Sequence, residues 1–182
     1  MKEKSKAFKV LLTIFIFGFV IWLGGTIFRT TIAYNLFTIG SNGMFLKPEY
    51  SNIERLTNIY LFSTTSLLTG IAYGLAACCS IVLAINTRKD FKRRGWLFMA
   101  FVLFLITVPI QVYFFYMDFQ LAQAVYYDGI RDFNHPSIQK YFVERYIDVK
   151  NASMRAILLL AAFTSMLYAI WRPLDNEQLA TN

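Results

Sequence analysis

The sequence predicts an all-α integral membrane protein, a four-helix bundle whose third and fourth helices extend into an outer hairpin. Hydrophobic residues make up 57% of the chain and charged residues only 16%, whereas about a quarter of the residues in a soluble domain are charged. The mean hydropathy of +0.45 points the same way. The charges also gather at the ends of apolar stretches, which is typical of helices that cross a bilayer.

Four apolar stretches are long enough to cross a membrane, which takes roughly 20 residues in a helix. They cover residues 10–28, 59–85, 96–117 and 152–171 of a single transmembrane domain, 1–182. The lysines before the first stretch resemble the start of a signal peptide. Its apolar core is too long for one, however, and no small-residue cleavage site follows in the right place, so we expect a retained helix.

Basic residues in the short connections predict the orientation, because Lys and Arg accumulate on the cytoplasmic side. The N-terminal tail is rich in lysine, and the loop 86–95, "NTRKDFKRRG", is rich in lysine and arginine. We therefore expect both termini and this loop in the cytoplasm, and segments 29–58 and 118–151 outside, in a plasma or inner membrane. The net charge of +7 then reflects topology, and we expect no nucleic-acid partner.

The second outer segment carries helix signals of its own. The pattern of the third span continues to Asp128–Gly129, about ten residues or roughly 15 Å past the lipid. After Pro136, which suits the first turn of a helix, a helical pattern runs without a breaker into the fourth span. The two helices are therefore expected to form one long antiparallel hairpin. In segment 29–58 we expect a turn at Gly40–Gly43 and apolar packing against that hairpin.

Small residues form a stripe along the second span, because they recur at steps of three and four. In lipid, helices associate by close backbone approach at such residues. We expect a helix–helix contact, either within the bundle or with another subunit. A groove for a lipid tail, a quinone or a pigment is the alternative. This contact seam consists of Ser63, Ser66, Gly70, Gly74, Ala77, Ser80 and Ala84.

The third span has a polar face, formed by Thr107, Gln111 and Asp118. Pro109 lies beside it, removes a backbone hydrogen bond and is expected to kink the helix. A kink beside a buried amide suits a ligand cavity or a gate. It also suits a purely structural amide that bonds to a neighbouring helix.

Three charges lie at similar depth near the outer boundary: Arg29, Asp118 and Arg155. A single buried charge is costly in a membrane, so we expect an Arg–Asp pair, or both arginines around Asp118. Contact between either arginine and lipid headgroups is the competing interpretation.

Motifs for chemistry are scarce. One histidine cannot supply the paired ligands of a b-type haem, and Cys78 and Cys79 are adjacent on a helix, so they point apart. A loose polar cluster in the outer turn suits either a metal or simple solvation: Asp128, Asp132, His135, Glu144 and Asp148. There is no phosphate-binding loop and no nucleophile set. We therefore expect a non-enzyme without cofactor or metal.

The function predicted is that of a non-catalytic accessory or scaffold subunit of a larger membrane complex. Its partners would be other integral-membrane subunits and lipids, contacted through the seam and the outer hairpin. The alternative is a bundle that binds a lipid, quinone or pigment near Pro109 and Gln111. A sensor or junction-type protein is a third possibility, which rests on topology alone.

Overall fold

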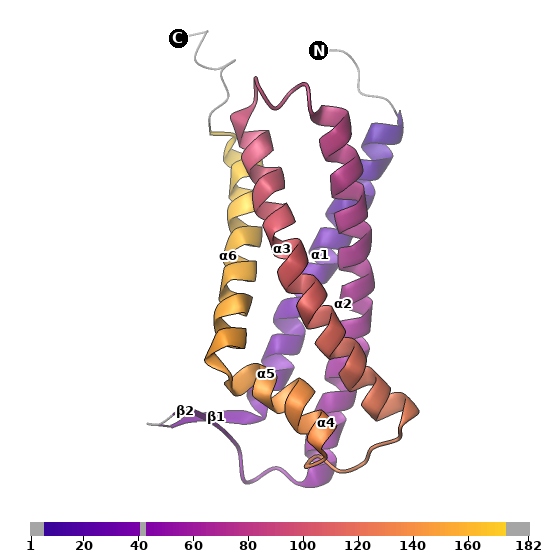
Figure 1. The fold of residues 1–182 in the computed structure, drawn as a ribbon, viewed down its shortest axis with the longest axis vertical. Helices are drawn as coiled ribbons and strands as arrows, with labels where there is room; N and C mark the ends of the chain where they lie inside the picture. Colours follow the sequence, from indigo (N-terminus) through magenta and orange to yellow (C-terminus); the bar gives the residue numbers. More distant parts are fainter. Residues whose placement is uncertain (1–5, 41–42, 174–182) are drawn as a thin grey trace.

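Four long helices dominate the computed structural model, which describes residues 6–40 and 43–173 (Figure 1). They are α1 (Lys6–Asn35), α2 (Asn52–Thr87), α3 (Gly95–Ala122) and α6 (Val149–Trp171). All four are long and apolar enough to span a membrane. This confirms the prediction of four helices with the length and composition of membrane spans and indicates a multi-pass membrane protein.

The bundle has two different ends, which we name by what they carry. The basic end holds the start of α1, the α2–α3 loop with its Lys and Arg residues, and the end of α6 (Figure 1). The capped end is covered by a β-hairpin and by residues 123–148. Most of the described residues outside the four long helices therefore lie at one end of the bundle.

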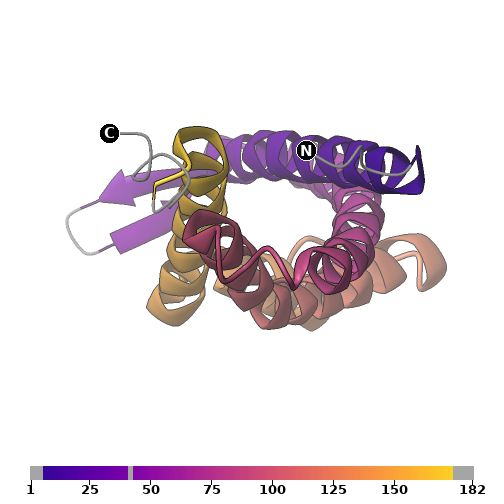
Figure 2. The same cartoon turned by 90° about the horizontal axis from the view of Figure 1, so that it is seen from above.

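The four helices meet in an apolar core near the middle of the bundle. α1 packs along α2 and α3 packs along α6, while α2 and α3 join the two pairs; Figure 2 shows the arrangement along the bundle axis. The rings of Trp22 and Tyr73 lie 5.0 Å apart, between centroids. The core residues are Phe19, Trp22, Ala72, Tyr73, Ala76, Phe104, Leu158 and Ala162.

The contact between α1 and α2 depends on two glycines of α1. A Cβ added to Gly18 would lie 2.7 Å from the backbone oxygen of Ala72, and one added to Gly25 would lie 2.2 Å from Cγ2 of Thr69. The two backbones therefore approach more closely than any larger residue allows. This is the small-residue packing expected between helices in lipid, although the glycines concerned are on α1.

A second apolar core fills the capped end, where an unexpected β-hairpin is anchored. β1 (Phe37–Gly40) pairs antiparallel with β2 (Gly43–Leu46), so the all-α prediction was incomplete here. Aromatic and β-branched residues favour strands over helix in this stretch, and Gly43 has a φ of +126°. Phe37 is buried and stacks on Phe142, with 6.3 Å between ring centroids.

A bent helical segment lies across the capped end. It consists of α4 (Pro136–Ile138), the π-helical turn η2 (Gln139–Val143) and α5 (Glu144–Ile147). The expected unbroken helix into the fourth span is interrupted at Asp148, whose backbone is extended and whose carboxylate accepts from the Lys150 N–H at 3.1 Å. Aspartate favours such caps. The segment therefore turns away from the axis of α6 (Figure 1). α3 does continue beyond its span, as the π-helical turn η1 (Gln123–Tyr127).

We predict that Gly18→Ala destabilises the protein and that Gly24→Ala does not. A methyl at position 18 meets backbone, whereas one at position 24 meets no atom within 4 Å. Overpacking of this kind costs about 1–3 kcal/mol. Both changes gain the same helix propensity, so the difference in unfolding temperature between the two variants, measured in detergent, isolates the contact. Equal unfolding temperatures would contradict the close α1–α2 approach.

Candidate functional site

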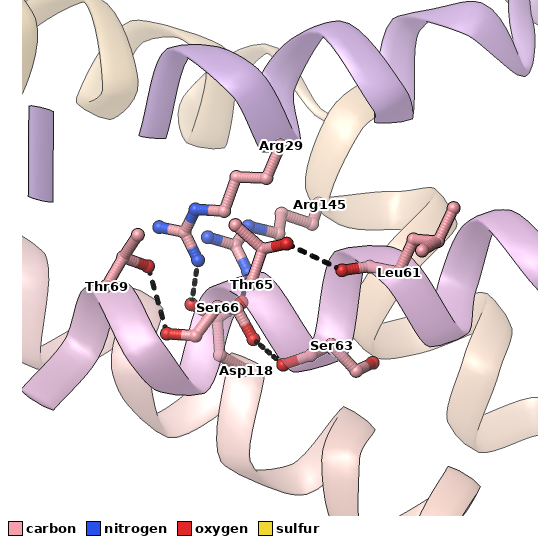
Figure 3. Close-up of polar contacts among 8 residues, drawn as sticks. All are labelled: Arg29, Leu61, Ser63, Thr65, Ser66, Thr69, Asp118 and Arg145. Atoms are coloured by element: carbon pink, nitrogen blue, oxygen red, sulfur yellow. Dashed lines mark hydrogen bonds and ion pairs between the residues drawn. The ribbon is translucent and has the colours of Figure 1, made fainter. Parts of the chain in front are cut away.

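The most distinctive site is a buried ion cluster, the arginine–aspartate centre, formed by Arg29, Asp118 and Arg145 (Figure 3). Asp118 lies on α3 and is 1% exposed. One of its carboxylate oxygens accepts a hydrogen bond from Nη1 of Arg29 on α1 at 2.6 Å. The other accepts from Nη1 of Arg145 on α5. One carboxylate thus ties three parts of the chain together.

Aromatic rings line the centre and bring α2 into it. Phe62 of α2 faces both guanidinium groups, with its ring centroid 5.6 Å from Cζ of Arg29 and 5.5 Å from Cζ of Arg145. The ring of Phe114 lies 4.8 Å from Cζ of Arg145. Cations are attracted to ring faces, and more strongly where water is excluded. The rings therefore replace part of the hydration that the arginines lose.

The centre carries an excess positive charge, because two arginines share one carboxylate. Burial by itself disfavours the charged form of Arg145, but the nearby Asp118 carboxylate, together with Tyr146 and Tyr113, outweighs that effect and raises the pKa of Arg145 above its ordinary value. Arg145 therefore remains a cation. The charged groups of Arg145 and Asp118 bind one another, so the cluster serves to hold parts of the structure together.

In the structure Arg29 pairs with Asp118, and the second arginine bound to Asp118 is Arg145, not Arg155. Arg155 lies on α6 with its Cζ 4.1 Å from the ring centroid of Tyr146. Neither of its Nη atoms has a hydrogen-bond partner among residues 6–40 and 43–173. Depth counted along the spans missed Arg145, because the helix that carries it folds back over the bundle. The available signal in the sequence was that Arg145 stands between the aromatic residues Phe142 and Tyr146. Both of these are buried in the structure.

The polar face of α3 is buried, but its residues have different surroundings. Thr107 lies 2.7 Å from the Tyr73 hydroxyl of α2, oxygen to oxygen. Gln111 is 3% exposed, and its Nε2 has no hydrogen-bond partner in the described part of the chain. Pro109 is exposed and lies on another side of a helix that continues through it. Pro109 and Gln111 are therefore not brought together in one site.

The predicted seam on α2 does not face the bundle along its whole length. Ser63, Ser66 and Ser80 are buried, and Ser66 and Ser80 donate to backbone oxygens of their own helix. A Cβ added to Gly70 would meet the ring of Phe115 of α3 at 2.2 Å, whereas Gly74 has open space around it. Ala77 and Ala84 are half-buried. The α1 contact instead follows the neighbouring stripe of α2, at Thr69, Ala72 and Ala76.

Two of the remaining polar candidates, like Asp148, accept hydrogen bonds from nearby backbone N–H groups. Asp132 accepts from the Asn134 N–H and His135 from the Ser137 N–H. No group of three potential metal ligands comes together among residues 6–40 and 43–173. Cys78 is exposed and Cys79 buried, so the two thiols point to different surroundings.

A groove of about 500 Å³ opens beside the arginine–aspartate centre, between α3, η2, α5 and the start of α6. It is lined by Tyr113, Tyr116, Met117, Lys140, Tyr141, Val143, Glu144, Ile147, Asp148 and Asn151. The sequence patterns did not predict it, because its walls join only after α4–α5 folds over α3.

Comparisons of the chain with protein-family models, with curated proteins and with solved structures find no match.

We predict that Asp118→Asn destabilises the protein more than Arg29→Gln does. Removing the carboxylate leaves two buried cations without a counter-charge, which costs about 3–5 kcal/mol. Removing Arg29 leaves the neutral pair of Asp118 and Arg145 and costs about 1.5–3 kcal/mol, the worth of one hydrogen bond between charged groups. The free energies of unfolding in detergent measure the order.

Asp128→Asn is the matched control for that comparison, because Asp128 is an exposed acid at the same end. It should leave the unfolding free energy unchanged. A loss for Arg29→Gln as large as that for Asp118→Asn would contradict the shared-carboxylate arrangement.

Proposed function

We propose that the protein is a non-catalytic accessory or scaffold subunit of a larger integral-membrane complex, and that it docks through its capped end. One observation carries the proposal: the β-hairpin holds large apolar side chains away from the rest of the molecule. Ile39 is 86% exposed and Phe45 50% exposed, and neither lies in a membrane-crossing helix. Burying such a side chain is worth about 1.5–3 kcal/mol, which favours a covering partner.

The hairpin suits docking because its base is anchored and its strands extend away from the bundle. Phe37 fixes its base in the capped-end core, and the strands project sideways from the bundle (Figures 1 and 2). In a sheet of two strands each strand has one edge without a strand partner. Such an edge can add a strand from another chain, with main-chain hydrogen bonds giving affinity and side chains such as Ile39 giving specificity.

The proposal also includes an orientation, with the basic end in the cytoplasm and the capped end outside, in a plasma or inner membrane. The Lys and Arg residues of loop 88–94 support it. We expect a membrane-impermeant maleimide to label Asp128→Cys, at an exposed position of the capped end outside the hairpin, in intact cells and Lys89→Cys only after permeabilisation, in a background with Cys78 and Cys79 replaced by alanine. Labelling in the reverse order would contradict the orientation.

We predict that the tagged full-length chain, extracted in mild detergent, migrates with stoichiometric membrane partners. Ile39→Asp and Phe45→Asp should each release those partners, because a carboxylate cannot enter an apolar interface without a large desolvation cost. Native electrophoresis of the purified material measures the complex size.

Ile53→Asp serves as the control, since Ile53 is exposed near the same end but lies on α2. It should leave the complex intact. A wild-type chain that runs only as a monomer, or hairpin variants that keep the partners, would sink the docking proposal.

A further inference from the structure

The groove beside the arginine–aspartate centre combines an aromatic wall with acidic groups. Three tyrosines contribute rings to it: Tyr113, Tyr116 and Tyr141. Glu144 and Asp148 contribute carboxylates, and Lys140 contributes the one ammonium group in the lining. The groove therefore carries one excess negative charge among electron-rich ring faces. Both features favour a cationic group, and an ammonium in particular.

The polar groups are available to a ligand. Glu144 is exposed, and its carboxylate has no ion-pair partner among residues 6–40 and 43–173. Asp148 uses one oxygen, Oδ1, to cap α6, which leaves the other oxygen to accept from a ligand. The Tyr113 hydroxyl donates to Oδ1 of Asn151 at 3.3 Å and so joins α3 to α6 within the groove lining.

A π-helical turn in the backbone shapes the groove. Lys140, Tyr141 and Val143 belong to the π-helical turn η2, and Glu144 follows it directly. A π turn inside an α-helix is uncommon and occurs frequently at functional sites, because the wider turn redirects side chains. Here it brings the lysine, a tyrosine and the glutamate to one opening.

The groove lies beside a lipid-facing surface. Tyr113, Tyr116 and Met117 are on α3, in a helix long and apolar enough to cross the membrane. Val112 and Phe119, on either side of them along α3, are exposed to the surroundings of the bundle. A lipid whose headgroup enters the groove can therefore lay its acyl chains along α3.

We propose that this groove binds the headgroup of a zwitterionic phospholipid that carries an ammonium group. The ammonium lies against the rings of Tyr113 and Tyr116 and donates to Glu144 and Asp148. The phosphate faces Lys140, whose Nζ lies 5.4 Å from the centroid of the Tyr141 ring. A headgroup without an ammonium leaves the two carboxylates unpaired. This inference uses contacts separate from the β-hairpin and does not depend on the docking proposal.

Native mass spectrometry of the full-length protein in detergent tests the proposal, with short-chain phosphatidylethanolamine and phosphatidylglycerol as probes. We expect one saturable site that prefers phosphatidylethanolamine by about tenfold, since a hydrogen bond to a charged group is worth about one factor of ten or more. The double variant Glu144→Gln/Asp148→Asn should abolish that preference. Asparagine caps a helix as well as aspartate does, so α6 keeps its start.

The matched control is Asp128→Asn/Asp132→Asn, which removes the same charge from the same end outside the groove. It should keep the tenfold preference. Tyr116→Leu should weaken phosphatidylethanolamine binding, whereas Tyr127→Leu, at a tyrosine exposed elsewhere, should not. Equal binding of the two lipids by the wild type, or an unchanged preference in the Glu144/Asp148 variant, would overturn the proposal.

Discussion

Two guanidinium groups depend on one carboxylate, and that dependence organises the molecule. Arg29 arrives on α1, Asp118 on α3 and Arg145 on α5, while α2 supplies the Phe62 ring that faces both arginines. Charges removed from water are tolerated only where geometry and counter-charge are supplied together. The centre therefore limits how far α1 and α3 can slide or rotate relative to one another. It also separates the apolar core of the four helices from the core of the capped end.

Aromatic rings around the centre stabilise its excess positive charge. Arg145 contacts Phe114 as well as Phe62, and Arg155 is stacked over Tyr146. Tyr146 in turn packs against Tyr34 of α1, with 5.6 Å between ring centroids. Aromatic side chains thus replace part of the hydration that these buried guanidinium groups would have at the surface. This accounts for part of the chain's high aromatic content.

The sequence allows the helices to be predicted because their signal is local. A run of about 20 apolar residues is typical of a helix that crosses a membrane. The similar depth of Arg29 and Asp118 could be counted along the spans. The place of Arg145 could not, since it depends on the cap at Asp148 and on the fold of residues 136–147 over α3. The small-residue stripe was similarly ambiguous. The sequence of α2 does not reveal which of its faces contacts α1. That face is determined by Gly18 and Gly25, which lie on α1.

The arginine–aspartate centre also has a consequence for how the protein is made. Arg29 precedes Asp118 by 89 residues, and Arg145 follows it by 27. In a chain synthesised from its N-terminus, α1 enters the bilayer before its counter-charge exists, so Arg29 must first reach toward water or headgroups with its long side chain. The ion cluster closes only after α5 has emerged. Its closure is therefore a late event of biogenesis, and a chain truncated before residue 145 has an incomplete centre.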